Sequence, residues 1–327
     1  MLNVLLLIVG LVLILGGANY LTDGAAAIAR RFGLSDLMVG LTIVALGTSA
    51  PELTISIMSA VQGNTGMAIG NVVGSNIFNV LLIIGVVALA RPIRVEKGIM
   101  INEIPMVILA SAAVLAMGLS PWLDGTPATI SRVGGILLLL FLCIFMRFLF
   151  TKARVKPAAK VHEDEVAETG RKGGDKKLWL SIVMVAGGLA ALVYGGDLFV
   201  DKASAIASSL GVSDAVIGLT IVAAGTSLPE LATSLTAAIK GNSGIALGNV
   251  IGSNIFNIFL VLGLAATIRP LPFAGVSTLD LLVMTGSAVL FWIFGWFFKT
   301  RTITRVEGAI MGACYVAYIT FLVIQAS

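Results

Sequence analysis

A motif of eight residues occurs twice in the chain, each time inside an apolar segment: residues 45–52 (ALGTSAPE) and 223–230 (AAGTSLPE). A carboxylate inside a bilayer costs roughly 3 kcal/mol on insertion scales, so Glu52 and Glu230 are candidates for a functional site. Each glutamate follows a proline, which lacks a backbone donor and frees the carbonyl four residues back. The motif therefore predicts two broken helices with exposed oxygens, a setting that suits hard cations.

The duplication extends well beyond this motif. Residues 63–79 (GNTGMAIGNVVGSNIFN) match residues 241–257 (GNSGIALGNVIGSNIFN), and both motifs recur at one offset, 178 residues. We therefore divide the chain into a first repeat (1–150), a linker loop (151–177) and a second repeat (178–327).

The composition indicates a membrane protein, because 58% of the 327 residues are hydrophobic and only 12% are charged. Ten apolar segments approach the spanning length of about 20 residues. They are 2–21, 38–60, 67–90, 100–119, 132–150, 178–200, 215–238, 244–267, 278–298 and 306–325. The expected fold is an all-α membrane protein of ten transmembrane helices. Five spans per repeat is an odd number, so the second repeat enters the membrane in the opposite sense and the two repeats are inverted. Two near-equal halves permit two near-equal states, one open to each side, which indicates an alternating-access transporter.

The basic residues predict the orientation. With the N-terminus outside, the cytoplasmic loops would hold 17 Lys and Arg residues and the opposite loops only three. We therefore expect both termini outside and the 151–177 loop in the cytoplasm. Asp23 and Asp201, near the predicted ends of the first and sixth spans, are expected in solvent, with a secondary cation entry as the alternative. Glu103 and Asp280, at the starts of the fourth and ninth spans, are expected to be solvated or paired near an interface.

The polar residues of the motif helices share helix faces. Thr48, Ser49 and Glu52 stand at i, i+1 and i+4. In the partner helix Asn71, Ser75 and Asn79 follow at i, i+4 and i+8, and the second repeat carries the equivalents Thr226, Ser227, Glu230, Asn249, Ser253 and Asn257. We interpret six polar residues as interhelical hydrogen-bonding residues: Asn71, Asn76, Asn249, Asn254, Thr42 and Thr220.

The types of ligand select the ion. Carboxylate, hydroxyl, amide and carbonyl oxygens without thiolate or imidazole favour Ca²⁺ or Na⁺ over zinc, copper or iron. Two carboxylates are neutralised by one Ca²⁺ or by two Na⁺. An enzyme is not expected, because the serines of these helices have no membrane His or Lys beside them, and no phosphate-binding loop indicates an ATP-driven pump.

At these motifs the chain resembles the cation/Ca²⁺ antiporter superfamily, specifically the prokaryotic sodium/calcium exchangers. The resemblance implies Na⁺/Ca²⁺ antiport by alternating access, with Glu52 and Glu230 as the central Ca²⁺ ligands. The further metal ligands that it implies are Thr48, Ser49, Ser75, Asn79, Thr226, Ser227, Ser253 and the carbonyl groups of Ala45 and Ala223. We add Asn257, where several relatives, K⁺-dependent exchangers among them, carry Asp. The site thus lacks a third acid, so exchange is expected to be independent of K⁺. It is also expected to be electrogenic. The alternative is H⁺/Ca²⁺ (or other divalent cation) exchange.

The remaining expectations concern partners and location. No cofactor is expected beyond the transported ions Ca²⁺ and Na⁺, and no nucleic acid. One chain supplies both halves of the site, so a monomer in the lipid bilayer is sufficient, with no obligatory protein partner. The family type suggests the plasma membrane of a prokaryotic cell.

Overall fold

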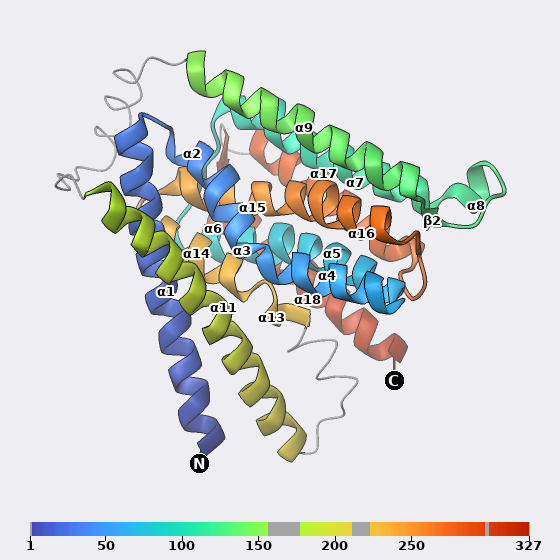
Figure 1. Cartoon of the computed structure of the whole chain (residues 1–327), viewed down its shortest axis with the longest axis horizontal. Coiled ribbons are helices and arrows are strands. Elements are labelled where there is room, and N and C mark those ends of the chain that lie inside the picture. Colours follow the sequence, from blue (N-terminus) through green and yellow to red (C-terminus); the bar gives the residue numbers. More distant parts are fainter. Residues whose placement is uncertain (1, 156–176, 211–222, 298–300, 327) are drawn as a thin grey trace. The chain divides into compact units, whose positions relative to one another are not determined.

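The computed structural model describes residues 2–155, 177–210, 223–297 and 301–326, and most of them are helical (Figure 1). The longer helices are α1 (Leu2–Phe32), α4 (Ala50–Gln62), α5 (Thr65–Ile77), α7 (Ile104–Gly118), α9 (Arg132–Val155), α11 (Leu178–Ser209), α14 (Leu228–Ile239), α15 (Ser243–Phe256), α17 (Thr278–Phe297) and α18 (Arg305–Ala326). The shorter ones are α2 (Asp36–Val39), α3 (Ala45–Thr48), α6 (Ile84–Ala90), α8 (Ser120–Leu123), α13 (Ala223–Gly225) and α16 (Gly263–Ile268). Four segments are π-helical: η1 (Gly40–Val44), η2 (Phe78–Ile83), η3 (Ile99–Glu103) and η5 (Asn257–Leu262).

Among the described residues, eight helical segments are long and apolar enough to span a membrane, and a ninth forms if α2–α3 and α4 make one broken span. These nine coincide with nine of the ten predicted segments. The remaining prediction, 215–238, includes residues 215–222, which lie outside the described part. A mostly helical membrane fold is thus confirmed, and the number ten stays a prediction.

Two helices are longer than the sequence predicted. The first span was expected to end at residue 21, but α1 continues to Phe32, and α11 continues to Ser209 instead of ending at 200. In α1 the residues after Asp23 are alanine-rich, and alanine is the best helix former. The helix stops where Gly33 adopts a left-handed conformation (φ 61°) and the Leu34 amide bonds the Ala29 carbonyl at 2.9 Å.

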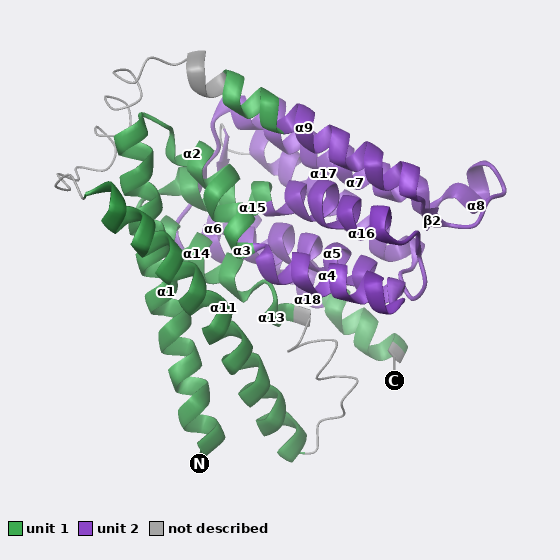
Figure 2. Cartoon of the chain, in the orientation of Figure 1, with its two compact units in different colours: residues 1–48, 146–252, 317–327 green, residues 49–145, 253–316 purple. Residues whose placement is uncertain are grey.

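The chain forms two compact units (Figure 2). Unit 1 comprises Met1–Thr48, Met146–Gly252 and Ala317–Ser327, and unit 2 comprises Ser49–Phe145 and Ser253–Val316. Each unit therefore combines segments from both sequence repeats. The division into repeats at 150 and 178 is a separate statement about the sequence and stays a prediction.

In unit 1, α1 and α11 pack closely along a row of small residues with a spacing of seven. A β-carbon built on Gly10 would lie 2.9 Å from the Gly195 carbonyl oxygen, and one on Gly17 would lie 2.7 Å from the Gly188 oxygen. One built on Gly24 would lie 2.9 Å from the Ser181 oxygen. The residue numbers rise in one helix as they fall in the other, so the two helices are antiparallel. Small residues let membrane helices approach until their backbones touch.

Unit 2 is held together by reciprocal pairings between the two repeats. Strand β1 (Ile93–Arg94) pairs antiparallel with β4 (Thr302–Ile303), and β2 (Thr129–Ile130) pairs antiparallel with β3 (Leu271–Pro272). β1 and β3 occupy equivalent places in the repeats, 178 residues apart. Each ribbon thus joins the end of one repeat's third span to the start of the other repeat's last span. These two-residue strands are the only departure from an all-α fold in the described ranges.

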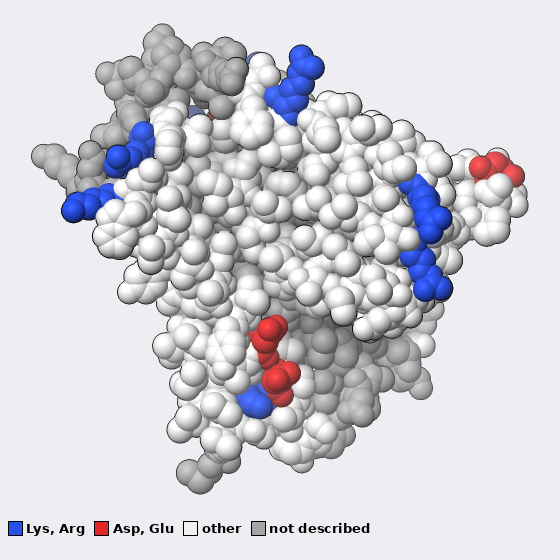
Figure 3. Space-filling model, viewed as in Figure 1, with Lys and Arg blue, Asp and Glu red and all other residues white. Residues whose placement is uncertain are grey.

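The surface fits a lipid environment. Many large apolar side chains are exposed, among them Leu5, Ile8 and Val12 of α1 and Ile144 of α9. On the face drawn in Figure 3, Lys, Arg, Asp and Glu form a few separate groups and most of the visible surface carries no charge. Such extensive exposed apolar surface marks a protein whose solvent is the bilayer.

Candidate ion-binding site

Each copy of the duplicated motif interrupts its helix, as its proline predicted. In the first copy, Ser49 (φ −82°, ψ 9°) separates α3 from α4, and Pro51 lies in the first turn of α4. In the second, Thr226 and Ser227 form a turn between α13 and α14, with Ser227 at φ −93° and ψ 8°. A break inside a membrane helix leaves backbone groups to be satisfied by neighbouring side chains or by ions.

The two glutamates occupy the first turns of the helices that follow the breaks. Glu52 in α4 and Glu230 in α14 are both fully buried. The N-terminal end of a helix carries partial positive charge, so each glutamate lies beside the positive end of its own helix. Ser75 of α5 donates a hydrogen bond from Oγ to Oε1 of Glu52 at 3.3 Å. Burying two carboxylates in a membrane is costly, and a bound cation would offset that cost.

The same pattern of hydrogen bonds holds the backbone at both glutamates. Asn71 donates from Nδ2 to the backbone oxygen of Glu52 (3.2 Å) and to Oγ of Ser56 (2.9 Å). Asn249 donates from Nδ2 to the backbone oxygen of Glu230 (3.3 Å) and to Oγ of Ser234 (2.9 Å). The interpretation of these two asparagines as interhelical hydrogen-bonding residues is confirmed. It is wrong for Thr42, which donates to the Met38 carbonyl of its own helical segment at 2.8 Å, and Thr220 lies outside the described residues.

The bracing in unit 1 includes one more bond. The Thr48 hydroxyl donates to Oδ1 of Asn249 at 3.0 Å, which leaves its oxygen lone pairs available. Its repeat equivalent, Thr226, has no hydrogen-bond partner for Oγ1 within the ranges described. Both threonines thus retain oxygen acceptors, which suits a cation ligand.

Asn79 and Asn257 lie in π-helical segments, η2 and η5. Both are fully buried. Three of their side-chain atoms have no hydrogen-bond partner in the described part of the chain: Nδ2 and Oδ1 of Asn79, and Oδ1 of Asn257. Buried polar atoms are almost always satisfied, so these atoms point to an ion or water. Neither the apolar pattern nor the motifs predicted the π-helical turns, which are frequent at functional sites.

The predicted ligands fall into two sets, one in each unit. Unit 1 contains Ala45, Thr48, Ala223, Thr226, Ser227 and Glu230. Unit 2 contains Ser49, Glu52, Ser75, Asn79, Ser253 and Asn257. Each set includes one buried glutamate. Ser49, Ser75, Ser227 and Ser253 are also buried. No group of three or more His, Cys, Asp or Glu residues that could bind a metal occurs in the portion described, so a cation would need hydroxyl, amide and carbonyl oxygens as well.

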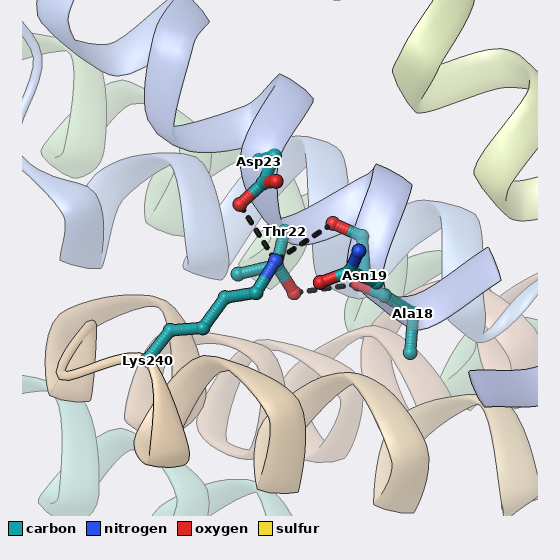
Figure 4. Close-up of polar contacts among 5 residues, drawn as sticks. All are labelled: Ala18, Asn19, Thr22, Asp23 and Lys240. Carbon is teal, nitrogen blue, oxygen red and sulfur yellow. Dashed lines mark hydrogen bonds and ion pairs between the residues drawn. The ribbon is translucent and has the colours of Figure 1, made fainter. Parts of the chain in front are cut away.

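The structure tests the predictions for two charged residues outside this set. The side chain of Asp23 is 38% exposed, so it contacts solvent as expected, but it also forms an ion pair. Lys240 Nζ lies 2.6 Å from Oδ1 of Asp23 and donates to the Asn19 carbonyl oxygen at 3.2 Å (Figure 4). The helix of Asp23 runs past the predicted span end, which brings its carboxylate beside Lys240 at the end of α14. Glu103 is buried in η3 with 1% exposed, so the solvated alternative is wrong for it.

Apolar spans, duplicated broken helices and buried carboxylates define a multi-pass membrane transporter class. The sequence profile described as sodium/calcium exchanger protein matches residues 2–151 and 180–324, and the chain belongs to this family. It is 39% identical over 314 residues to the putative antiporter CaxA of Alkalimonas amylolytica, covering 95% of each chain. It is 35% identical to the sodium/calcium exchanger MaX1 of Methanosarcina acetivorans over an alignment of 351 positions, which covers 98% of each chain. A solved structure of the sodium-calcium exchanger NCX_Mj matches with a TM-score of 0.81 and 32% identity, over 98% of both chains. The predicted family is thus confirmed, and it is a family of transporters, not of enzymes.

Proposed function

We propose that the protein is a secondary antiporter that exchanges Na⁺ for Ca²⁺ across the membrane by alternating access. The observation that carries this proposal is the pair of buried glutamates, each in the first turn after a helix break. Relatives that cover nearly the whole chain are named as sodium/calcium exchangers, and the comparisons do not favour the proton-coupled alternative.

The ligand assignment is part of the proposal. Glu52 and Glu230 bind Ca²⁺, and the other ligands to Ca²⁺ and Na⁺ are Thr48, Ser49, Ser75, Asn79, Thr226, Ser227, Ser253, Asn257 and the carbonyl oxygens of Ala45 and Ala223. The unsatisfied amide atoms of Asn79 and Asn257 and the hydroxyl of Thr226 support it. Hard cations with oxygen ligands account for all of these atoms.

The charge of this set defines the exchange. Two carboxylates bind one Ca²⁺ or two Na⁺ without net charge, and a third Na⁺ makes the exchange electrogenic. Asn79 and Asn257 are neutral, so the set has no third acid for K⁺, and we propose that transport is independent of K⁺. An empty site would carry two bare charges through a low-dielectric region, which disfavours leak and makes exchange obligatory.

The ribbon of β2 and β3 supports ten spans. Ile130 and Leu271 are paired, so both lie on the same side of the membrane. Three candidate spans separate them: Arg132–Thr151, Leu178–Ser209 and Ser243–Ile268. Three crossings would leave the partners on opposite sides, so an odd number of further crossings is needed between Ser209 and Ser243. The predicted seventh span, 215–238, supplies one.

The antiparallel packing of α1 and α11 supports an inverted repeat, because these are the first spans of the two repeats. We further propose that both termini lie outside a prokaryotic plasma membrane, that the 151–177 loop is cytoplasmic, and that a single chain performs transport.

The direct test is uptake of radiolabelled Ca²⁺ into proteoliposomes of defined lipid. Vesicles loaded with Na⁺ and diluted into Na⁺-free medium should accumulate Ca²⁺. Net positive charge then leaves the vesicle, because three Na⁺ exit for each Ca²⁺ that enters, and a potential-sensitive dye should report an interior that becomes negative. External and internal K⁺ should not change the rate. Uptake driven only by an outward H⁺ gradient would show that H⁺, and not Na⁺, is the coupling ion. The absence of uptake under either gradient would refute Ca²⁺ transport.

A further inference from the structure

Three asparagines of unit 2 form a buried chain of hydrogen bonds that ends on a proposed ligand. Asn76 of α5 donates from Nδ2 to the backbone oxygen of Asn254 at 3.3 Å. Asn257 in turn donates from Nδ2 to Oδ1 of Asn76 at 3.1 Å. Asn76 is 1% exposed and Asn257 is fully buried. Within the residues described, Oδ1 of Asn257 is the one atom of these two side-chain amides without a hydrogen-bond partner.

This chain has a direction that follows from the chemistry of the amide group. A backbone carbonyl can only accept, so Asn76 must turn its NH₂ group toward Asn254 and its oxygen toward Asn257. Asn257 must then offer NH₂ to that oxygen, since two carbonyl oxygens would repel each other. The remaining oxygen of Asn257 is thereby fixed as the group available to a ligand.

The equivalent position in the first repeat has no such constraint. Asn79 is also buried in a π-helical segment, but neither its Nδ2 nor its Oδ1 has a hydrogen-bond partner in the described ranges. The amide of Asn79 can therefore turn either end toward a ligand. The two proposed amide ligands thus differ in how firmly they are oriented.

We propose that Asn76 is a positioning residue, which holds the amide of Asn257 so that its oxygen, and not its NH₂ group, is presented to the transported cation. The proposal rests on the cation-exchange function proposed above. An amide turned the other way would place hydrogen-bond donors against a cation and remove one ligand. Residues that orient metal ligands commonly change metal affinity about 10- to 100-fold when they are removed.

The test compares the apparent KM for Ca²⁺ of the full chain in proteoliposomes. Asn76→Leu removes both hydrogen bonds at similar volume, and we expect it to raise KM about 10-fold with the maximal rate largely kept. Asn76→Gln keeps an amide donor and an amide acceptor without adding charge, and it should stay closer to the original KM. Asn102→Leu is the matched control, because Asn102 is a half-buried membrane asparagine that donates to a backbone carbonyl, that of Gly98, at 2.9 Å.

A second background separates positioning from a structural role. In Asn257→Asp, either oxygen of the carboxylate can serve the cation, so neither end of this side chain has to be selected, and Asn76 can turn its NH₂ group toward the carboxylate. Adding Asn76→Leu to that background should change KM less than twofold, whereas a residue needed only for packing would cause the same rise in both backgrounds. Isothermal titration with Ca²⁺ gives the same ratios for binding without requiring turnover, and the unfolding midpoint confirms that each variant is folded.

The outcomes are distinct. If the unchanged protein exchanges ions, two results would overturn the positioning role and leave the exchange function intact. One is an unchanged KM in Asn76→Leu, and the other is an equal rise in KM in both backgrounds. Failure of the unchanged protein to bind or transport Ca²⁺ would overturn both proposals.

Discussion

The two bracing asparagines make unequal numbers of hydrogen bonds, which predicts unequal stability effects at equivalent positions. Asn71→Leu removes two bonds, to Glu52 and Ser56. Asn249→Leu removes three, because Asn249 also accepts from Thr48. At about 1 kcal/mol per bond, the expected losses in free energy of unfolding are about 2 and 3 kcal/mol. The difference in burial also predicts the larger loss for Asn249→Leu, since Asn249 is fully buried and Asn71 is only partly buried.

The two variants are controls for each other, because they make the same substitution at equivalent positions of the two repeats. Unfolding would be followed in mild detergent micelles by titration with SDS, with circular dichroism reporting the helices. An equal cost for the two substitutions, or a larger cost for Asn71→Leu, would refute the reasoning that the Thr48 bond adds stability in unit 1.

Two further predictions concern unit 1 away from the proposed ligands. Gly17→Val places a β-carbon 2.7 Å from the Gly188 backbone oxygen and should cost about 1–3 kcal/mol, whereas Gly16→Val, with nothing within 4 Å, should be nearly neutral in the same titration. Similar effects of both would contradict close backbone packing of α1 and α11. Lys240→Gln breaks a partly exposed ion pair and should cost less than about 1 kcal/mol, and less still at high salt; a salt-independent loss would argue against an electrostatic origin.

The sequence was most informative where a local chemical rule applies. Pro51 and Pro229 predicted the breaks in the motif helices because proline cannot complete the helical ladder. Asn71 and Asn249 were recognisable as interhelical residues because amides are costly in a bilayer unless they are bonded. The family followed from the same motifs.

Other features depend on information that a linear pattern does not contain. Asp23 and Lys240 are separated by 217 positions, so only the fold pairs them. The π-helical turns at Asn79 and Asn257 change the backbone hydrogen bonding without changing the apolar pattern, and periodicity therefore missed them. The end of α1 was placed too early because the prediction followed an apolar segment of about the spanning length, whereas helix propensity continues through the alanines beyond it.

The most direct test of the central claim is the number of Ca²⁺ ions that one chain binds. Isothermal titration of the purified protein should give one Ca²⁺ per chain, because the proposed ligand assignment gives both glutamates to a single ion. Glu52→Gln and Glu230→Gln should each abolish that binding, and each should also abolish Na⁺-driven Ca²⁺ uptake while leaving the protein folded. Two Ca²⁺ ions per chain, with one retained in each variant, would show two independent sites and contradict the account.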